Sequence, residues 1–260
     1  MNILSLNIAC LPRCINIIGN IYKRLELIQL LLKKLNPNII LLQEVFSNYS
    51  RNSLYNYLKK NNYNVLLSPY NPIYLNGGLL IATKHRIITS SYYTYKNCFG
   101  EDSLSCKGIL YAQLVVKRKI IHLFNTHNNN IKPSFSLYKN TEIIYKKQLE
   151  EFINYIYYIK KKYKSYYKII DPSNISYILA GDFNLNHNST LYHYIINRLK
   201  KHYKVCTNKK KIVTDNLDNT QVDYIINCYD KRIKNIPYSK TITFPNLFIS
   251  DHNTVFKYIS

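Results

Sequence analysis

The chain has 260 residues and a net charge of +22, from 36 Lys and Arg against 14 Asp and Glu. A hydrophobic fraction of 47% is enough for a core, and no apolar run approaches the roughly 20 residues that a membrane-spanning helix needs. The six cysteines form no CxxC pair, which argues against a zinc ribbon and against a disulfide scaffold.

The N-terminus alternates apolar and polar residues from Met1 onward, as a strand does. It lacks the basic start, the long apolar stretch and the cleavage site of a signal peptide, so we expect an intracellular, cytoplasmic protein. The positive charge attracts anions, including nucleic acid and acidic membrane surfaces. Abundant Lys, Asn, Ile and Tyr are also typical of an AT-rich coding sequence, so charge alone does not choose a substrate.

Short apolar runs alternate with amphipathic stretches in the first half of the chain. Residues 3–8 read as a strand, and residues 22–35 carry Leu25, Ile28 and Leu32 at helical spacing. Residues 38–43 form a continuous apolar run, as expected of a strand buried on both faces. The pattern then predicts a helix over residues 53–60 and strands over 64–68 and 77–83.

The second half continues the same alternation. Strands are expected over 109–117 and 120–126, joined by a hairpin turn, and the longest helix over 141–167. Next come a strand over 175–180, a helix over 190–200, and strands over 222–227 and 254–259, with surface loops at 128–133 and 208–218. No repeat or linker divides the chain, so we expect one α/β domain over residues 1–260, with two packed sheets flanked by helices.

Polar side chains recur where the predicted strands end. An acid placed directly after a buried strand is costly unless it is paired or coordinated, so we expect these ends to meet in one cleft. Their oxygens suit Mg²⁺, with Mn²⁺ as the alternative, and too few His and Cys converge for zinc. Taken singly, each has a structural explanation as a turn, a helix cap or a core group. The groups are Asn7, Glu44, Asn125 to His127, Asp182 with Asn184, Asp223, and Asp251 with His252.

The order of these groups resembles the endonuclease/exonuclease/phosphatase superfamily over nearly the whole chain. The resemblance implies a DNase I-like, four-layer α/β/β/α sandwich with its site at one edge of two mixed sheets. The matching motifs are Ser5-Leu6-Asn7, Gln43-Glu44, Thr126-His127, Gly181-Asp182-Phe183-Asn184, Asp223-Tyr224 and Ser250-Asp251-His252.

The resemblance also implies a metal side of the cleft. Glu44 would be the principal Mg²⁺ ligand and Asn7 would assist it. Asp251 would lie on the same side.

A catalytic side follows from the same resemblance. His252 would be the general base that takes a proton from water, and Asp223 would orient it. Asp182 and Asn184 would position the nucleophile and the phosphoryl oxygens, and His127 would stabilise the charge that builds on phosphorus. An imidazole suits base chemistry near neutral pH.

Three segments are similar to neutral, Mg²⁺-dependent sphingomyelinases: residues 76–87, residues 106–112 and Phe124-Asn125-Thr126-His127. They imply a phosphodiesterase that converts sphingomyelin into phosphocholine and ceramide, with Lys107 and Asn125 contacting the substrate. The chain departs from that group after His127, where three Asn stand in place of a Leu-Gln pair, and at Arg86, which replaces a proline.

The expected partner is therefore phospholipid, met at a membrane surface by a peripheral monomer. Residues 91–96 and 238–248 are aromatic and basic and are candidates for this contact, although both also fit a buried strand or hairpin. A nuclease acting at abasic sites or like DNase I is the main alternative, and the charge favours it. An inositol polyphosphate phosphatase comes third, and a non-enzymatic binding module is the remaining class.

Overall fold

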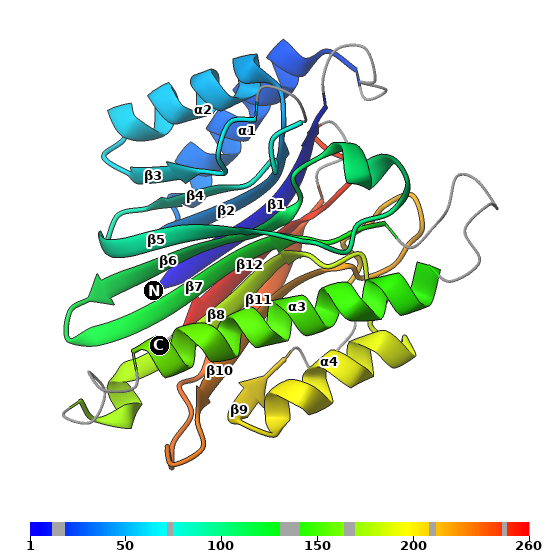
Figure 1. Cartoon of the computed structure of the whole chain (residues 1–260). Coiled ribbons are helices and arrows are strands. Elements are labelled where there is room, and N and C mark those ends of the chain that lie inside the picture. The colour runs from blue at the N-terminus through cyan, green and yellow to red at the C-terminus, as the bar shows by residue number, and fades with distance from the viewer. Residues whose placement is uncertain are drawn as a thin grey trace.

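The computed structural model describes residues 1–11, 19–71, 75–130, 141–163, 170–207, 212–245 and 249–259. Two six-stranded sheets pack face to face, and helices cover both outer faces (Figure 1). The strand orders are β11-β12-β1-β2-β4-β3 in the first sheet and β5-β6-β7-β8-β10-β9 in the second. The predicted four-layer α/β/β/α sandwich is confirmed.

The first sheet is built around two parallel, almost entirely buried strands, β1 and β2. β12 runs antiparallel to β1, so the C-terminal strand lies beside the N-terminal one. Helices α1 and α2 cover the outer face, α1 capped by Asn20 and α2 by Ser47. The elements are β1 (Asn2–Cys10), α1 (Ile21–Leu35), β2 (Ile39–Val45), α2 (Asn48–Lys60), β3 (Asn64–Leu67), β4 (Leu80–Thr83), β11 (Ser239–Phe244) and β12 (Thr254–Ile259).

The second sheet repeats this plan around the parallel pair β7 and β8. The expected hairpin joins β6 to β7, with Val116 opposite Lys119. Helices α3 and α4 cover its outer face. The elements are β5 (Arg86–Thr94), β6 (Gly108–Val116), β7 (Lys119–His127), α3 (Thr141–Lys162), β8 (Ile175–Asp182), α4 (Thr190–Lys200), β9 (Tyr203–Cys206) and β10 (Asp223–Asp230), with short 3₁₀ turns at Gly100–Leu104 and Pro172–Asn174.

The core has three apolar layers, one between the sheets and one under each pair of helices. Leu41, Leu123 and Ile178 lie in the central layer. Leu42 packs under α1 and α2, and Phe124 packs under α3 and α4. Burying one such side chain contributes about 1.5–3 kcal/mol, so the strands stay fixed in register and hold their ends in place.

Some predicted boundaries were wrong. The loop expected at 128–133 begins with Asn128 and Asn129, which are buried, and residues 131–133 lie outside the described part of the chain. Of the loop expected at 208–218, residues 212–218 are described and Thr214 is buried there. The longest helix ends at Lys162, five residues short of the expected end, and residues 164–169 are not described.

The strand β9 was not predicted, and β5 and β11 were expected only as one of two interpretations of residues 91–96 and 238–248. They are edge strands with mixed polar, aromatic and basic residues, so their hydrophobic alternation is weak. β5 covers most of the candidate membrane segment at 91–96, and β11 covers much of the one at 238–248. These parts are strands, but their residues are half-buried or exposed and not buried as the strand interpretation expected, and Phe248 lies outside the described residues.

The register sets the functional geometry. β1, β2, β7 and β8 all finish at one end of the sandwich, which we call the site end, and β10 and β12 begin there. Asn7 stands opposite Gln43, and Asp182 stands opposite both His127 and Asp223. We call the other end, where these four strands begin, the far end.

Candidate functional site

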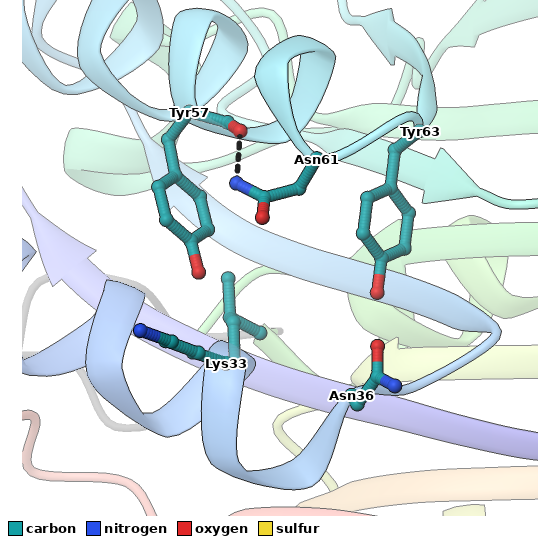
Figure 2. A pocket seen from close by; sticks show the side chains of 6 residues that line it. Lys33, Asn36, Tyr57, Asn61 and Tyr63 are labelled. Atoms are coloured by element: carbon teal, nitrogen blue, oxygen red, sulfur yellow. Dashed lines mark hydrogen bonds between the residues drawn. The ribbon is translucent and has the colours of Figure 1, made fainter.

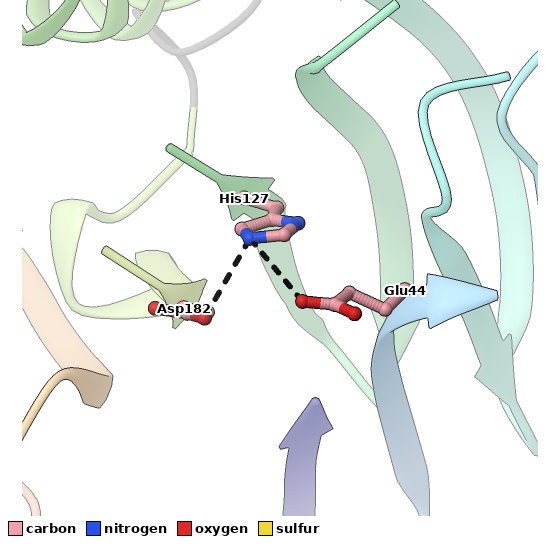
Figure 3. A group of neighbouring side chains, drawn as sticks. All are labelled: Glu44, His127 and Asp182. Carbon is pink, nitrogen blue, oxygen red and sulfur yellow. Dashed lines mark ion pairs between the residues drawn. The ribbon is translucent and has the colours of Figure 1, made fainter. Parts of the chain in front are cut away.

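Glu44, His127 and Asp182 meet at the site end, although they come from three different strands and from both sheets (Figure 3). His127 Nε2 lies 3.8 Å from Glu44 Oε1 and 3.6 Å from Asp182 Oδ2. One ligand atom from each of the three residues lies within 4.8 Å of the others, which suits a shared cation. The predicted convergence of strand ends is confirmed for this group.

Asn7 links the two carboxylates. Its Nδ2 donates to Glu44 Oε1 at 2.8 Å and to Asp182 Oδ2 at 3.0 Å, while its Oδ1 accepts from the Ala9 amide at 3.0 Å. In this arrangement Asn7 orients the acids, and its direct ligation of a metal stays a prediction. Glu44 itself has a φ of 57°, a conformation that costs a non-glycine residue about 1–3 kcal/mol and turns its side chain out of the strand.

His252 and Asp223 form a second group that shares Asp182 with the first. His252 Nδ1 is hydrogen-bonded to Asp223 Oδ2 at 2.8 Å, and His252 Nε2 lies 3.8 Å from Asp182 Oδ2. Asp223 is fully buried and His252 nearly so. This bond fixes the ring with Nε2 toward the carboxylate cluster, which is the orientation that a general base needs.

Burial and charge oppose each other in this cluster. Burial lowers the pKa of His252, but Asp223, Asp182 and Asp251 outweigh it and raise that pKa well above 6.5. Burial, followed by the charge of Asp223, raises the pKa of Asp182 above its usual value, and burial also raises the pKa of Glu44. Such acids gain from a nearby cation that offsets their mutual repulsion.

The donor set fits a hard divalent cation. Carboxylate oxygens dominate it, and one imidazole completes it. Asp223 Oδ1 is buried and has no hydrogen-bond partner among the described residues, so the cluster carries more acceptor capacity than the protein itself satisfies. Glu44 and Asp182 are the residues best placed to hold the ion.

Lys107 reaches the cluster from the start of β6. Its Nζ lies 2.7 Å from Asp102 Oδ1, 3.1 Å from His127 Nε2 and 3.1 Å from the Asn128 carbonyl. Burial, with the charge of Lys107 as the next cause, lowers the pKa of His127 well below 6.5, so this ring is neutral at pH 7. Lys107 therefore brings the positive charge of this wall of the cleft.

Asn184 completes the same wall. Its amide nitrogen donates to Asp182 Oδ1 at 2.8 Å, and its Nδ2 donates to the Asn128 carbonyl at 2.9 Å. Sequence reasoning missed Asn128 and Asp102, which together hold Asn184 and Lys107. The Asn128 to Asn130 run gave no signal of burial, and Asp102 lies in a segment without apolar periodicity.

The substrate role predicted for Asn125 was wrong. Its side chain is fully buried between the sheets, where Oδ1 accepts from Gln43 Nε2 at 2.7 Å and Nδ2 donates to the Leu42 and Leu80 carbonyls at 3.0 Å. All of its polar atoms are thus used to join the two sheets, and it has no atom left for a substrate.

Asp251 is partly exposed and accepts from Ser250 Oγ at 3.1 Å, and its place on the metal side stays a prediction.

Two further residues anchor the segment that carries His252. Ser250 Oγ donates to the Asn7 carbonyl at 2.7 Å and accepts from the His252 amide at 3.2 Å. Arg24, buried on α1, donates from Nε to the Ile249 carbonyl at 2.8 Å and from Nη2 to the Ile8 carbonyl. An arginine directly before Leu25, in the buried stripe of an amphipathic helix, was the signal that the sequence offered for this anchor.

Comparison with known proteins adds a family match. The model described as the Endonuclease/Exonuclease/phosphatase family matches residues 4–252. A sphingomyelinase of Dictyostelium discoideum is 31% identical over 183 residues, which cover 57% of this chain and 37% of that protein. The match therefore spans little more than a third of the length of the curated relative.

Solved structures share the fold over the full chain. SmcL superposes with a TM-score of 0.76 at 18% identity, covering 100% of this chain and 98% of that one. A beta toxin mutant from Staphylococcus aureus with bound magnesium ions gives 0.76 at 20% identity, with 99% and 98% covered. D. rerio TDP2 complexed with a single-strand DNA product gives 0.70 at 18% identity, with 100% and 98% covered. Among the described residues, no helix is both long enough and apolar enough to cross a bilayer.

Proposed function

The chain belongs to the endonuclease/exonuclease/phosphatase family, and from this premise we propose that it is an Mg²⁺-dependent phosphodiesterase that hydrolyses sphingomyelin to phosphocholine and ceramide. The observation that carries the chemistry is the meeting of Glu44, His127, Asp182, Asp223 and His252 at one end of two sheets. The sphingomyelinase relative and the magnesium-containing beta toxin support the substrate and the metal.

His252 acts as the general base. Asp223 holds Nδ1, so Nε2 faces the cleft and takes a proton from the attacking water. Protonation leaves an imidazolium that the carboxylates of Asp223 and Asp182 stabilise. This is the same division of work between an imidazole and a buried acid that hydrolases with a catalytic triad use.

The remaining residues of the cleft manage the charge on the phosphate. Glu44 and Asp182 would hold the Mg²⁺, which when bound polarises a phosphoryl oxygen and neutralises the diester. Lys107 places an ammonium beside His127, and the Asn184 side chain lies on the same wall, bonded like Lys107 to the Asn128 carbonyl. These groups are fixed before the substrate arrives, so little reorganisation is needed in the transition state.

Exposed apolar side chains favour a lipid substrate. Tyr70, Leu104, Ile143 and Leu217 lie on turns or helix starts at the site end and are 66%, 59%, 56% and 79% exposed. Apolar groups held in water around a cleft are typical of a surface that meets a membrane interface. They would enter the head-group region and bring the cleft to the phosphodiester.

A nucleic-acid phosphodiester is the second candidate, supported by the likeness to D. rerio TDP2 and by the net charge. The position of the described cations argues against it. Exposed lysines and arginines gather at the far end, where a nucleic acid lying in the cleft would not reach them. Lysine at the cleft itself is represented among the described residues by buried Lys107.

A side-by-side assay tests the proposal. Purified protein is offered sphingomyelin vesicles, lysophospholipid, abasic duplex DNA and inositol polyphosphates, each with Mg²⁺ and again with a chelator. We expect release of phosphocholine from sphingomyelin that the chelator abolishes. DNA strand cleavage without phosphocholine release would overturn the substrate assignment and leave the phosphodiesterase chemistry in place.

A further inference from the structure

Nearly half of the 36 Lys and Arg lie in short segments at the far end, and these segments contain no Asp or Glu. Almost all of their basic side chains are exposed, with Lys160 half-buried. Asp230 lies next to one of them and is ion-paired with Arg232 at 2.8 Å. We call this surface the basic face, and its segments are residues 33–34, 59–60, 84–86, 117–119, 160–162, 200–201 and 231–234.

The topology explains how segments so distant in sequence share one face. All four helices start after a strand that finishes at the site end, and so each helix ends at the far end. The turns β4–β5, β6–β7 and β10–β11 lie there too, as the pairs Ile39–Thr83, Val116–Lys119 and Ser239–Ile259 show. The N- and C-termini mark the same end in Figure 1.

Two general effects raise the number of lysines, and neither accounts for the whole basic face. Lysines in the last turn of a helix interact favourably with its dipole, which accounts for the lysines at the helix ends: Lys33, Lys34, Lys59, Lys60, Lys160, Lys161, Lys162 and Lys200. That effect does not act on the hairpin turns at 117–119 and 231–234. An AT-rich coding sequence adds lysine to every exposed position and does not place it at one end.

The basic face contains no built site for a small anion. One of its cavities, of about 340 Å³, is lined by residues 171–173 and 232–235, which place the acid Asp171 with Arg232 and Lys234. The other, between the ends of α1 and α2 and of about 250 Å³, is lined by Lys33, Asn36, Tyr57, Asn61 and Tyr63 (Figure 2). The polar groups are bonded within the protein: Tyr57 to the Gln29 carbonyl at 2.9 Å, Tyr63 to the Pro37 carbonyl at 2.6 Å and Asn61 to the Tyr57 carbonyl at 2.8 Å. The charge therefore acts as a spread surface and not as a pocket.

We propose that the basic face docks onto an anionic phospholipid bilayer. Most of its cations are lysines, which bind as mobile point charges without the paired hydrogen bonds of arginine. Each lysine or arginine near an anionic membrane contributes about 1 kcal/mol, or about fivefold in affinity. Tyr238 and Tyr258 are exposed beside these cations and have the amphipathic character of interfacial side chains.

The position of the basic face makes this bilayer a different one from that which supplies the substrate. β1 has nine residues, so at about 3.3 Å per residue the two ends lie about 30 Å apart. This exceeds the Debye length of about 8 Å at physiological salt, so the acids of the cleft do not weaken the basic face. With the cleft on a sphingomyelin-containing membrane, the basic face is turned outward and bridges to a second, anionic one. The bridging rests on the proposed function, whereas the docking does not.

Docking is tested with vesicles that contain phosphatidylserine and no sphingomyelin, by co-sedimentation at increasing salt. The variant Lys161→Gln/Lys162→Gln removes two charges from the basic face. Its matched control Lys146→Gln/Lys147→Gln removes two exposed charges from the site-end half of the same helix. We expect about 25-fold weaker binding for the first pair, at about fivefold per charge, and less than about threefold for the second.

Equal losses for the two pairs would overturn the basic face as the docking surface. Duplex DNA bound more tightly than the vesicles at the same salt would also overturn it, because the surface would then belong to nucleic acid.

Bridging is tested by fluorescence energy transfer between two labelled vesicle populations, one with sphingomyelin and one with phosphatidylserine, in the presence of a chelator. We expect energy transfer with the unmodified protein only when both vesicle populations are present, and no energy transfer with Lys161→Gln/Lys162→Gln. This variant should still release phosphocholine once Mg²⁺ is restored. Docking without phosphocholine release would contradict the proposed function alone. Phosphocholine release without docking would contradict this inference alone.

Discussion

The two ends of the sandwich carry opposite chemistry on one scaffold. At the site end, acids, imidazoles and amides are buried and bonded to one another, as in the contacts of Asn7 with Glu44 and Asp182. At the far end, cations stand apart in water on turns and helix ends. The strands therefore fix the position of a polar group only at the end where its neighbours are also polar and buried.

The difference also separates two kinds of function. Catalysis needs groups held within hydrogen-bond distance of one another. The second sheet places Asp182 and Asp223 opposite each other. Attraction to a charged surface needs only the number and sign of charges. Changes at the site end should therefore act on turnover, and changes at the far end on association.

Loss of the general base tests whether the site end alone carries the chemistry. His252→Ala removes the base and should lower turnover about 10²- to 10⁴-fold, with folding preserved as judged by circular dichroism. The matched control is His202→Ala, an exposed histidine near the far end, which should keep full turnover. Similar losses of turnover in both variants would show that the two ends do not differ in their contribution to catalysis.

The next effect concerns the anchor behind the site. Arg24→Met leaves the carbonyls of Ile8 and Ile249 without their buried donor, which should cost about 2–4 kcal/mol in the free energy of unfolding. Turnover should fall about 10- to 100-fold because the segment that carries His252 loses its support. Urea denaturation and steady-state kinetics measure both, with the exposed neighbour Lys23→Met as control. Unchanged stability would show that the guanidinium is replaceable.

A third effect lies between the two ends, at buried His122 in the middle of β7. Burial lowers its pKa to about 3, and its ring stacks on Tyr177 and is hydrogen-bonded to the Tyr111 hydroxyl at 2.8 Å. Between pH 6.5 and about 3 the unfolded chain binds a proton there that the folded chain does not, so stability falls as pH falls. The slope is about 1.4 kcal/mol per pH unit.

Replacement of this histidine isolates its contribution. We expect His122→Gln to unfold with a shallower loss of stability below pH 6.5 than the unmodified protein, in urea titrations at several pH values. Parallel pH profiles for the two proteins would show that the ring is protonated without penalty in the folded state.

The smallest effect concerns the exposed apolar side chains at the site end, which include Leu104 and Leu217. Leu104→Ser/Leu217→Ser should slow phosphocholine release from vesicles about 3- to 10-fold, because less apolar surface enters the interface. Hydrolysis of a water-soluble phosphocholine ester should not change. Leu30→Ser, on an exposed side of α1 away from the cleft, is the control. A loss on the soluble ester as well would place these leucines in the chemistry and not in membrane contact.

Much of this architecture was predictable because its central strands are mostly apolar and polar residues separate them. The strands β1, β2, β7 and β8 are buried along most of their length, and polar groups at their ends predicted a shared cleft. The order of the polar groups along the chain was the decisive information, since Glu44 and Asp182, taken alone, each fit a purely structural role.

The predictions that failed concern the direction of side chains and contacts between distant segments. Asn125 stands two positions before His127 and therefore points to the same face of the strand, yet it ends between the sheets, bonded to Gln43. Asn128 looked like a loop residue, and only the fold shows that its carbonyl receives both Lys107 and Asn184. Neither contact leaves a periodic pattern in the sequence.

Distant strand ends form one site for a divalent cation, and titration calorimetry with Mg²⁺ measures whether an ion binds there. Binding should be measurable in the unmodified protein and in Glu26→Gln, an exposed acid on α1, and should be lost in Glu44→Gln. Equal Mg²⁺ affinity in Glu44→Gln and Glu26→Gln would show that the ion binds elsewhere, without the acid that the fold presents to it.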